Sequence, residues 1–139
     1  MDRAHRPCFL VVDREYSGSI STRKLVIETA KFNVLTAYSV DEALEAIRRF
    51  PAIDAIVMDA EMPEMPCPDL VRSLKHLAPS IPVIIIHRPL SEPCTGADYQ
   101  LDTFDPRQLL TLLQTLCPEQ AEAVEKRNES LKSEEKDRN

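Results

Sequence analysis

Glycine, aromatic residues and long apolar runs are scarce in this chain of 139 residues. It has two glycines, Gly18 and Gly96, no tryptophan, and 5% aromatic residues. Two isolated glycines cannot form the glycine-rich loop with which many folds surround a phosphate group. No apolar run is long enough to span a bilayer, and the N-terminal residues lack the apolar core of a signal peptide. We therefore expect a cytoplasmic protein with no membrane segment and no glycine-rich nucleotide loop.

The chain also lacks recognisable cysteine motifs and an excess of positive charge. Its four cysteines, Cys8, Cys67, Cys94 and Cys117, form no CxxC pair and have no histidine at zinc-site spacing. In a cytoplasmic protein such cysteines are expected to be free structural thiols. The net charge of −6 disfavours nucleic acid or an anionic membrane as a direct partner.

Short apolar runs alternate with segments of helical spacing along most of the sequence. We expect strands at residues 8–12, 33–37, 54–58, 82–86 and 99–101. We expect helices at residues 19–32, after a cap at Ser39 or Asp41, at 69–77 and at 107–116. Continuous apolar strands that alternate with helices are typical of a doubly wound parallel α/β sheet with helices on both faces.

The first of these helices has a predicted inner face. Ile20, Leu25, Ile27 and Ala30 are the apolar residues that we expect to face the sheet.

Two segments depart from the alternation of strands and helices. Residues 87–98 contain Pro89, Pro93 and Gly96, which leave room for one helical turn at most. Residues 119–139 are highly charged and are expected to form a frayed helix, a short coiled coil or a disordered tail. We therefore divide the chain into a folded domain, 1–118, and a charged tail, 119–139.

Asp59 is the main candidate for a functional residue. It ends the apolar run 54–58 and precedes the pair Met62-Pro63. The carboxyl ends of strands are where open parallel sheets place their binding and catalytic residues. Asp59 is therefore a candidate nucleophile or metal ligand.

Five motifs in order resemble the receiver domain of response regulators in two-component signalling. They are Phe9-Leu10-Val11-Val12-Asp13, Val34-Leu35-Thr36-Ala37 with Glu42-Ala43-Leu44, Asp59 with Met62-Pro63, Pro82-Val83-Ile84-Ile85, and Tyr99 with Phe104-Asp105-Pro106. The resemblance covers residues 9–116. It implies a flavodoxin-like fold with strand order 2-1-3-4-5 and, in this chain, a fourth helix that is shortened or missing.

The resemblance also implies roles for individual residues. Asp59 would be the phosphoacceptor, and a weak Mg²⁺ site would be formed by Asp13, Asp59 and the backbone carbonyl of Glu61. Tyr99 would be the aromatic residue that moves inward when the domain switches. The implied partners are a histidine kinase, a phosphotransfer protein or an output domain, and a homodimer is a further option.

Three positions depart from the family pattern. Arg14 stands where a second acidic residue is expected, and it either folds over Asp59 as a fixed cation or points to solvent. His87 stands at the serine or threonine position, and Asp102 at the lysine position. At about 5 Å and an effective dielectric constant near 20, one pair of unit charges is worth roughly 3 kcal/mol, so an aspartate in place of lysine opposes a phosphoryl group.

These departures lead to a functional expectation. We expect a degenerate receiver-like domain that acts as a phosphorylation-independent protein-interaction module, with no firm cofactor and a doubtful Mg²⁺ site. The alternative is a working phosphoacceptor, phosphorylated on Asp59 by a histidine kinase or a phosphotransfer partner. We do not expect an enzyme, because the sequence contains no convincing pair of nucleophile and base and no cofactor loop.

Overall fold

The computed structural model describes residues 6–14, 21–50, 52–88, 90–102 and 104–117. The strands are β1 (Cys8–Val12), β2 (Asn33–Ala37), β3 (Ala55–Asp59), β4 (Val83–Ile86) and β5 (Tyr99–Leu101). The helices are α1 (Thr22–Thr29), α2 (Val40–Arg49), α3 (Cys67–Leu77) and α4 (Pro106–Leu116). All strand pairs are parallel, in the order β2-β1-β3-β4-β5. The predicted flavodoxin-like sheet is therefore confirmed, and the charged tail 119–139 lies outside the described residues.

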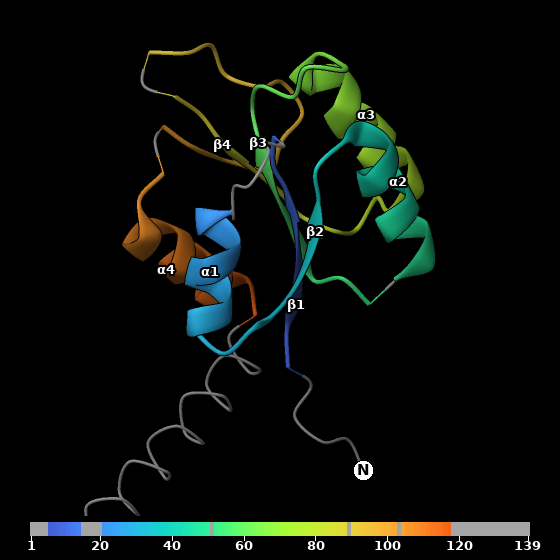
Figure 1. Ribbon diagram of the computed structural model, residues 1–139. Coiled ribbons are helices and arrows are strands. Elements are labelled where there is room, and N and C mark those ends of the chain that lie inside the picture. Colours follow the sequence, from blue (N-terminus) through green and yellow to red (C-terminus); the bar gives the residue numbers. More distant parts are fainter. Residues whose placement is uncertain (1–5, 15–20, 51, 89, 103, 118–139) are drawn as a thin grey trace, which may run out of the picture.

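Two helices cover each face of the sheet (Figure 1). On one face, Leu10 and Ile56 pack with Leu70 of α3, and on the other Phe9 and Val57 pack with residues of α1 and α4. Successive side chains of a strand point to opposite faces, so a central strand of a sheet covered on both sides is buried on both of its faces. All five residues of β3, including Asp59, are accordingly buried.

Helix α1 differs from its prediction on its inner face. Ile27 is fully buried, but Leu25, which was predicted to face the sheet, is 47% exposed. Residues two positions apart on a helix lie on nearly opposite sides, so Leu25 and Ile27 cannot both face the core. The predicted beginning of this helix, including Ile20, lies outside the described residues.

The start of α2 resolves the choice of its cap. The Ser39 side chain accepts a hydrogen bond from the backbone N–H of Glu42, so Ser39 is the N-cap and Asp41 lies in the first turn. The Val40 backbone N–H donates to Glu64 Oε2 at 2.7 Å. This bond fixes the loop after β3 to the start of α2.

The connection between β4 and β5 contains no helix in the residues that the structure describes, as predicted. Gly96 has a φ of +94°, and a Cβ atom placed there would lie 3.5 Å from Cγ1 of Val71. Since Val71 belongs to α3, the connection passes close to that helix. In the sequence, this connection lies where the resemblance to receiver domains would place a fourth helix.

A disulfide bond joins this connection to the beginning of α3. Cys67 and Cys94 are bonded with a Cα–Cα distance of 5.8 Å, so the prediction of free thiols is wrong for this pair. It is confirmed for Cys8 and Cys117. Sequence spacing could not reveal the pair, because it forms only where two loops meet in the folded chain. Among the described residues, no helix is long and apolar enough to cross a membrane.

Candidate functional site

Asp13 and Asp59 follow neighbouring strands at the same end of the sheet. Val12 of β1 is in register with Met58 of β3, so the next residue of each strand lies at the same level. Asp59 is only 8% exposed, and its Oδ1 accepts a hydrogen bond from the backbone N–H of Glu61 at 2.7 Å. The structure thus places two of the predicted site residues side by side.

Arg23 of α1 lies between these two carboxylates. Its Nη1 donates to Asp13 Oδ1 at 3.1 Å and to Asp59 Oδ2 at 3.0 Å. The Arg23 side chain is 14% exposed, and its guanidinium carbon lies 5.7 Å from the centre of the Phe104 ring. One cation therefore pairs with both acids and offsets one of their two negative charges, in a largely dry environment where such contacts are strong.

Ser21 fixes the start of α1 and hence the position of Arg23. Its hydroxyl donates to Asp13 Oδ2 at 2.9 Å and accepts from the backbone N–H of Lys24 at 3.2 Å. Ser21 is thus the N-cap of α1 and also a partner of the acidic site. Because Arg23 is two residues further on, the same cap holds its side chain over the carboxylates.

Arg23 was missed by the sequence reasoning, which named Arg14 as the candidate fixed cation. Arg14 lies at the edge of the site, with Nε 3.9 Å from Asp59 Oδ2 and Nη1 4.0 Å from Glu61 Oε2. It therefore leans toward the acids, but the position between Asp13 and Asp59 belongs to Arg23. The only sequence signal for Arg23 is its place two residues after a capping serine.

The arrangement does not fit the Mg²⁺ site that the resemblance implied. A divalent ion shared by Asp13 and Asp59 would meet the Arg23 guanidinium, because both carboxylates already bind its Nη1. Like charges at such a distance repel strongly in a partly buried site. Within the described ranges, no group of three or more histidine, cysteine or acidic side chains could hold a metal ion.

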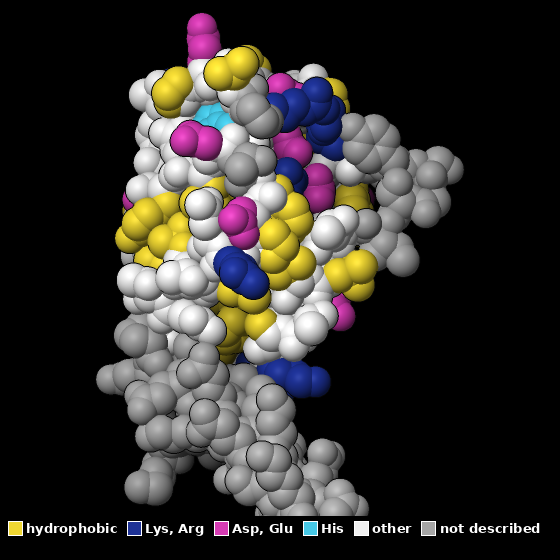
Figure 2. Space-filling view, turned by 90° about the vertical axis from the view of Figure 1, so that its left-hand side faces the viewer, with side chains coloured by type: hydrophobic (Ala, Val, Ile, Leu, Met, Phe, Trp, Pro, Cys, Tyr) yellow, Lys and Arg dark blue, Asp and Glu magenta, His cyan; other side chains and the backbone are white. Residues whose placement is uncertain are grey.

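Charged side chains continue from the site onto the surface. Arg88 Nε lies 3.0 Å from Glu61 Oε2, so Glu61 is between Arg14 and Arg88. Figure 2 shows basic and acidic side chains gathered at this end of the molecule. Three arginines thus face three acids: Arg14, Arg23 and Arg88 against Asp13, Asp59 and Glu61.

His87 is buried at the end of β4, with 6% of its surface exposed. Its Nε2 lies 2.6 Å from Gln100 Oε1 and its Nδ1 lies 3.1 Å from Ser91 Oγ. The backbone N–H of Cys94 also donates to Gln100 Oε1, so this amide oxygen is an acceptor and His87 Nε2 carries a hydrogen. The His87 ring therefore binds the β4–β5 connection through Nδ1 and β5 through Nε2.

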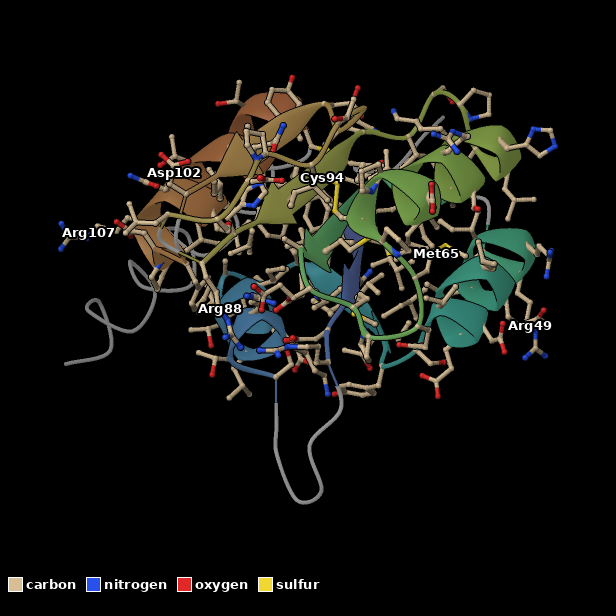
Figure 3. The ribbon with its side chains drawn as sticks, turned by 90° about the horizontal axis from the view of Figure 1, so that it is seen from above. Arg49, Met65, Arg88, Cys94, Asp102 and Arg107 are labelled. Atoms are coloured by element: carbon tan, nitrogen blue, oxygen red, sulfur yellow. A yellow bond between two sulfur atoms is a disulfide. The ribbon has the colours of Figure 1, made fainter. Side chains whose placement is uncertain are left out.

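Asp102 and Tyr99 face outward. Tyr99 is 40% exposed on the edge strand β5, in register with Ile84. Asp102 is exposed just after β5, and Figure 3 shows it on the same side of the molecule as Arg107. The structure therefore gathers Asp13, Asp59 and Glu61 with three arginines, and it leaves the predicted switch aromatic on the surface.

An α/β sheet of this order is the flavodoxin-like fold, and it places the buried Asp59 at the carboxyl end of β3. The family model of the response regulator receiver domain matches residues 9–105 of the chain. The chain belongs to the response regulator receiver domain family. No curated protein sequence matches it significantly.

Solved receiver structures have the same fold. A CheY-like receiver domain protein from Methanospirillum hungatei is 22% identical with a TM-score of 0.71, covering 86% of this chain and 99% of that chain. The receiver domain of NtrC4 from Aquifex aeolicus is 25% identical with a TM-score of 0.68, covering 81% and 98%. CheY in the CheX–CheY–BeF₃–Mg²⁺ complex from Borrelia burgdorferi is 21% identical with a TM-score of 0.67, covering 79% and 88%.

Proposed function

We propose that this receiver domain acts as a cytoplasmic protein-interaction module whose state does not depend on phosphorylation. The observation that carries the proposal is the contact of Arg23 with both Asp13 and Asp59. A built-in cation is paired with both acids without a metal ion or a phosphoryl group. A domain of this kind presents its surface to a partner without phosphorylation of Asp59.

The environment of Asp59 opposes its use as a nucleophile. Its Oδ2 accepts from Arg23 and its Oδ1 accepts from the Glu61 backbone, so both oxygens have donors. Hydrogen bonds to both oxygens make a carboxylate a weaker nucleophile, and attack on a phosphoryl group also needs a cation that is free to bind the incoming phosphoryl oxygens. Arg23 would have to leave one carboxylate before Mg²⁺ could enter. This movement would break a contact that Arg23 already makes with Asp13 or Asp59.

The hydrogen bonds of His87 also oppose a phosphorylation switch. His87 has its two ring nitrogens on Ser91 and Gln100, so turning toward Asp59 would break both contacts. An arrangement that buries the ring nitrogens without hydrogen-bond partners is higher in free energy. This supports a surface that is not switched by phosphorylation of Asp59.

A protein partner is the binding class that the family and the charge favour. The Borrelia relative was solved in a complex with CheX, which shows a receiver binding another protein. The net charge of −6 disfavours nucleic acid. We propose a histidine kinase, a phosphotransfer protein or an output domain as the partner class, and no enzymatic activity of the chain's own.

A phosphodonor assay tests the proposal. The full chain is incubated with Mg²⁺ and acetyl phosphate or phosphoramidate, alongside a receiver domain of known phosphorylation, and intact masses are measured. We expect no gain of a phosphoryl group in this chain while the reference protein is labelled. A stable gain that Asp59→Asn removes would overturn the proposal and establish the alternative, a working phosphoacceptor.

A further inference from the structure

The disulfide between Cys67 and Cys94 lies beside the acidic site, at the end of the sheet where the functional residues gather. Cys67 is the first residue of α3 and follows the loop that begins at Asp59. Cys94 belongs to the β4–β5 connection that starts at His87. Figure 3 shows the sulfur–sulfur bond joining this connection to the start of α3. The bond therefore couples two loops next to the site.

Cys94 is the anchor of an otherwise exposed segment. It is 2% exposed and packs in the core with residues of α3, whereas residues 90–93, 95 and 96 are exposed. Its backbone N–H donates to Gln100 Oε1, the acceptor that also binds His87. The position of this one residue thus links the segment to the His87 contacts.

Most of the core is formed by residues other than the two cysteines. The two core clusters consist mainly of strand and helix residues that are almost completely buried, such as Leu10 and Leu74 on one face and Val57 and Leu109 on the other, and Cys94 belongs to the first cluster. A bond that ties a loop to the edge of a core can open locally while the rest of the core remains packed. This distinguishes it from the disulfides that hold small secreted domains together.

The other two cysteines differ from this pair in their surroundings. Cys8 and Cys117 are free thiols. Burial raises the pKa of both thiols, and the nearby negative charge of Asp54 raises each further. They are therefore protonated and poor nucleophiles, whereas Cys67 lies at a helix N-terminus, which stabilises a thiolate. Its N-cap, Pro66, has no side-chain hydrogen bond to the first turn.

We propose that Cys67 and Cys94 form a reversible redox site that exchanges electrons with a thiol–disulfide couple, such as glutathione or a dithiol protein. The oxidised state holds the β4–β5 connection against α3, and the reduced state releases it. The surface beside Asp59 and His87 therefore differs between the two states. This inference does not depend on whether Asp59 is phosphorylated.

The exchange balances in two steps. In oxidation, the Cys67 thiolate attacks one sulfur of the oxidant disulfide, and a mixed disulfide forms as the first thiolate leaves. The Cys94 thiolate then attacks the Cys67 sulfur, forms the intramolecular bond and expels the second thiolate. Each cysteine thiol loses one proton, two electrons pass to the oxidant, and two thiols are produced. Reduction is the reverse, and the half-buried Cys67 is the more accessible sulfur for attack.

The test follows the bond in the folded protein. The full chain is equilibrated in buffers with a graded ratio of reduced to oxidised glutathione, or with a thioredoxin system, then quenched in acid and alkylated under denaturing conditions. Intact mass counts the free thiols. We expect a reversible change from two to four free thiols without denaturant, on Cys67 and Cys94. Hydrogen exchange of residues 90–98 should become faster upon reduction, while that of β3 stays unchanged.

Matched variants locate the effect. The double variant Cys8→Ser and Cys117→Ser should keep the transition, and the double variant Cys67→Ser and Cys94→Ser should lose it. The wild-type titration decides the question even if a variant fails to fold. A bond that millimolar glutathione and thioredoxin open only after unfolding would overturn the proposal. So would four thiols that remain reduced throughout the titration.

Discussion

Arg23 Nη1 lies 3.0 Å from Asp59 Oδ2 and 3.1 Å from Asp13 Oδ1, between the two acids to which the resemblance assigned a metal ion. The guanidinium is held from one side by Asp13 and lies near the Phe104 ring. A mobile divalent cation could leave the site or accept a phosphoryl oxygen. A side chain fixed to α1 stays paired with both acids, and this difference can be measured.

Arg23→Ala is predicted to destabilise the fold and to create a metal-binding site. It leaves Asp13 and Asp59 close together without the cation between them, and breaking a buried ion pair in this way costs about 3–5 kcal/mol. Mg²⁺ should recover part of this loss, by about 1.4 kcal/mol when its concentration is ten times the dissociation constant. Thermal unfolding with and without Mg²⁺ measures both effects.

Arg88→Ala is the matched control for this experiment. Arg88 pairs with Glu61 at the exposed edge of the site, where an ion pair is worth about 0–1 kcal/mol. The unfolding temperature of the Arg88→Ala variant should not change when Mg²⁺ is added. If the unmodified protein and Arg23→Ala respond to Mg²⁺ equally, Arg23 does not occupy the cation position.

Gln100→Leu is predicted to loosen the β4–β5 connection. Gln100 Oε1 is the acceptor for His87 Nε2 at 2.6 Å and for the Cys94 backbone N–H at 2.7 Å. Leaving two buried donors without an acceptor costs about 1–3 kcal/mol. Urea unfolding measures the loss, and Gln108→Leu on the exposed surface of α4 is the control. Equal stability of the two variants would contradict the role of Gln100.

Asp98 is predicted to make the stability of the fold depend on pH. Burial alone would raise the pKa of its carboxyl, but hydrogen bonds from Lys75 and the Val83 backbone, together with the Lys75 charge, outweigh burial and lower this pKa. Because the pKa is lower in the folded state, Asp98 stabilises the fold above its unfolded pKa. This contribution disappears as the pH falls through the folded pKa.

Asp98→Asn should therefore be less stable than the unmodified protein at neutral pH. The difference in the free energy of unfolding should shrink as the pH falls below about 3.9, the ordinary pKa of aspartate. In a Lys75→Met background, the same substitution should show a smaller pH dependence. Urea unfolding across the acid range checks this, and a difference that stays constant with pH would refute the prediction.

The sequence was sufficient to predict the sheet and the position of Asp59, but not the composition of the site. The apolar runs at 8–12 and 82–86 are continuous, and both are buried strands in the structure. Arg23 gave no such signal, because its role depends on how α1 packs beside β1 and β3. The Cys67–Cys94 bond was hidden for the same reason, since its cysteines are 27 positions apart in the sequence and only the folded chain brings them together. Periodicity reports burial along one element, whereas both features depend on contacts between elements.

Loss of the Cys67–Cys94 bond is predicted to lower stability without abolishing folding. For a sequence separation of 27, the restriction of the unfolded chain gives a contribution of about 3.5 kcal/mol. Urea unfolding of the double variant Cys67→Ser and Cys94→Ser should therefore occur at lower urea than that of the oxidised protein. The reduced wild-type protein should unfold close to the variant, because both lack the same restraint. The double variant Cys8→Ser and Cys117→Ser keeps the bond, so reductant should still lower its midpoint. If reductant leaves the wild-type midpoint unchanged, the bond does not restrain the unfolded chain as this prediction requires.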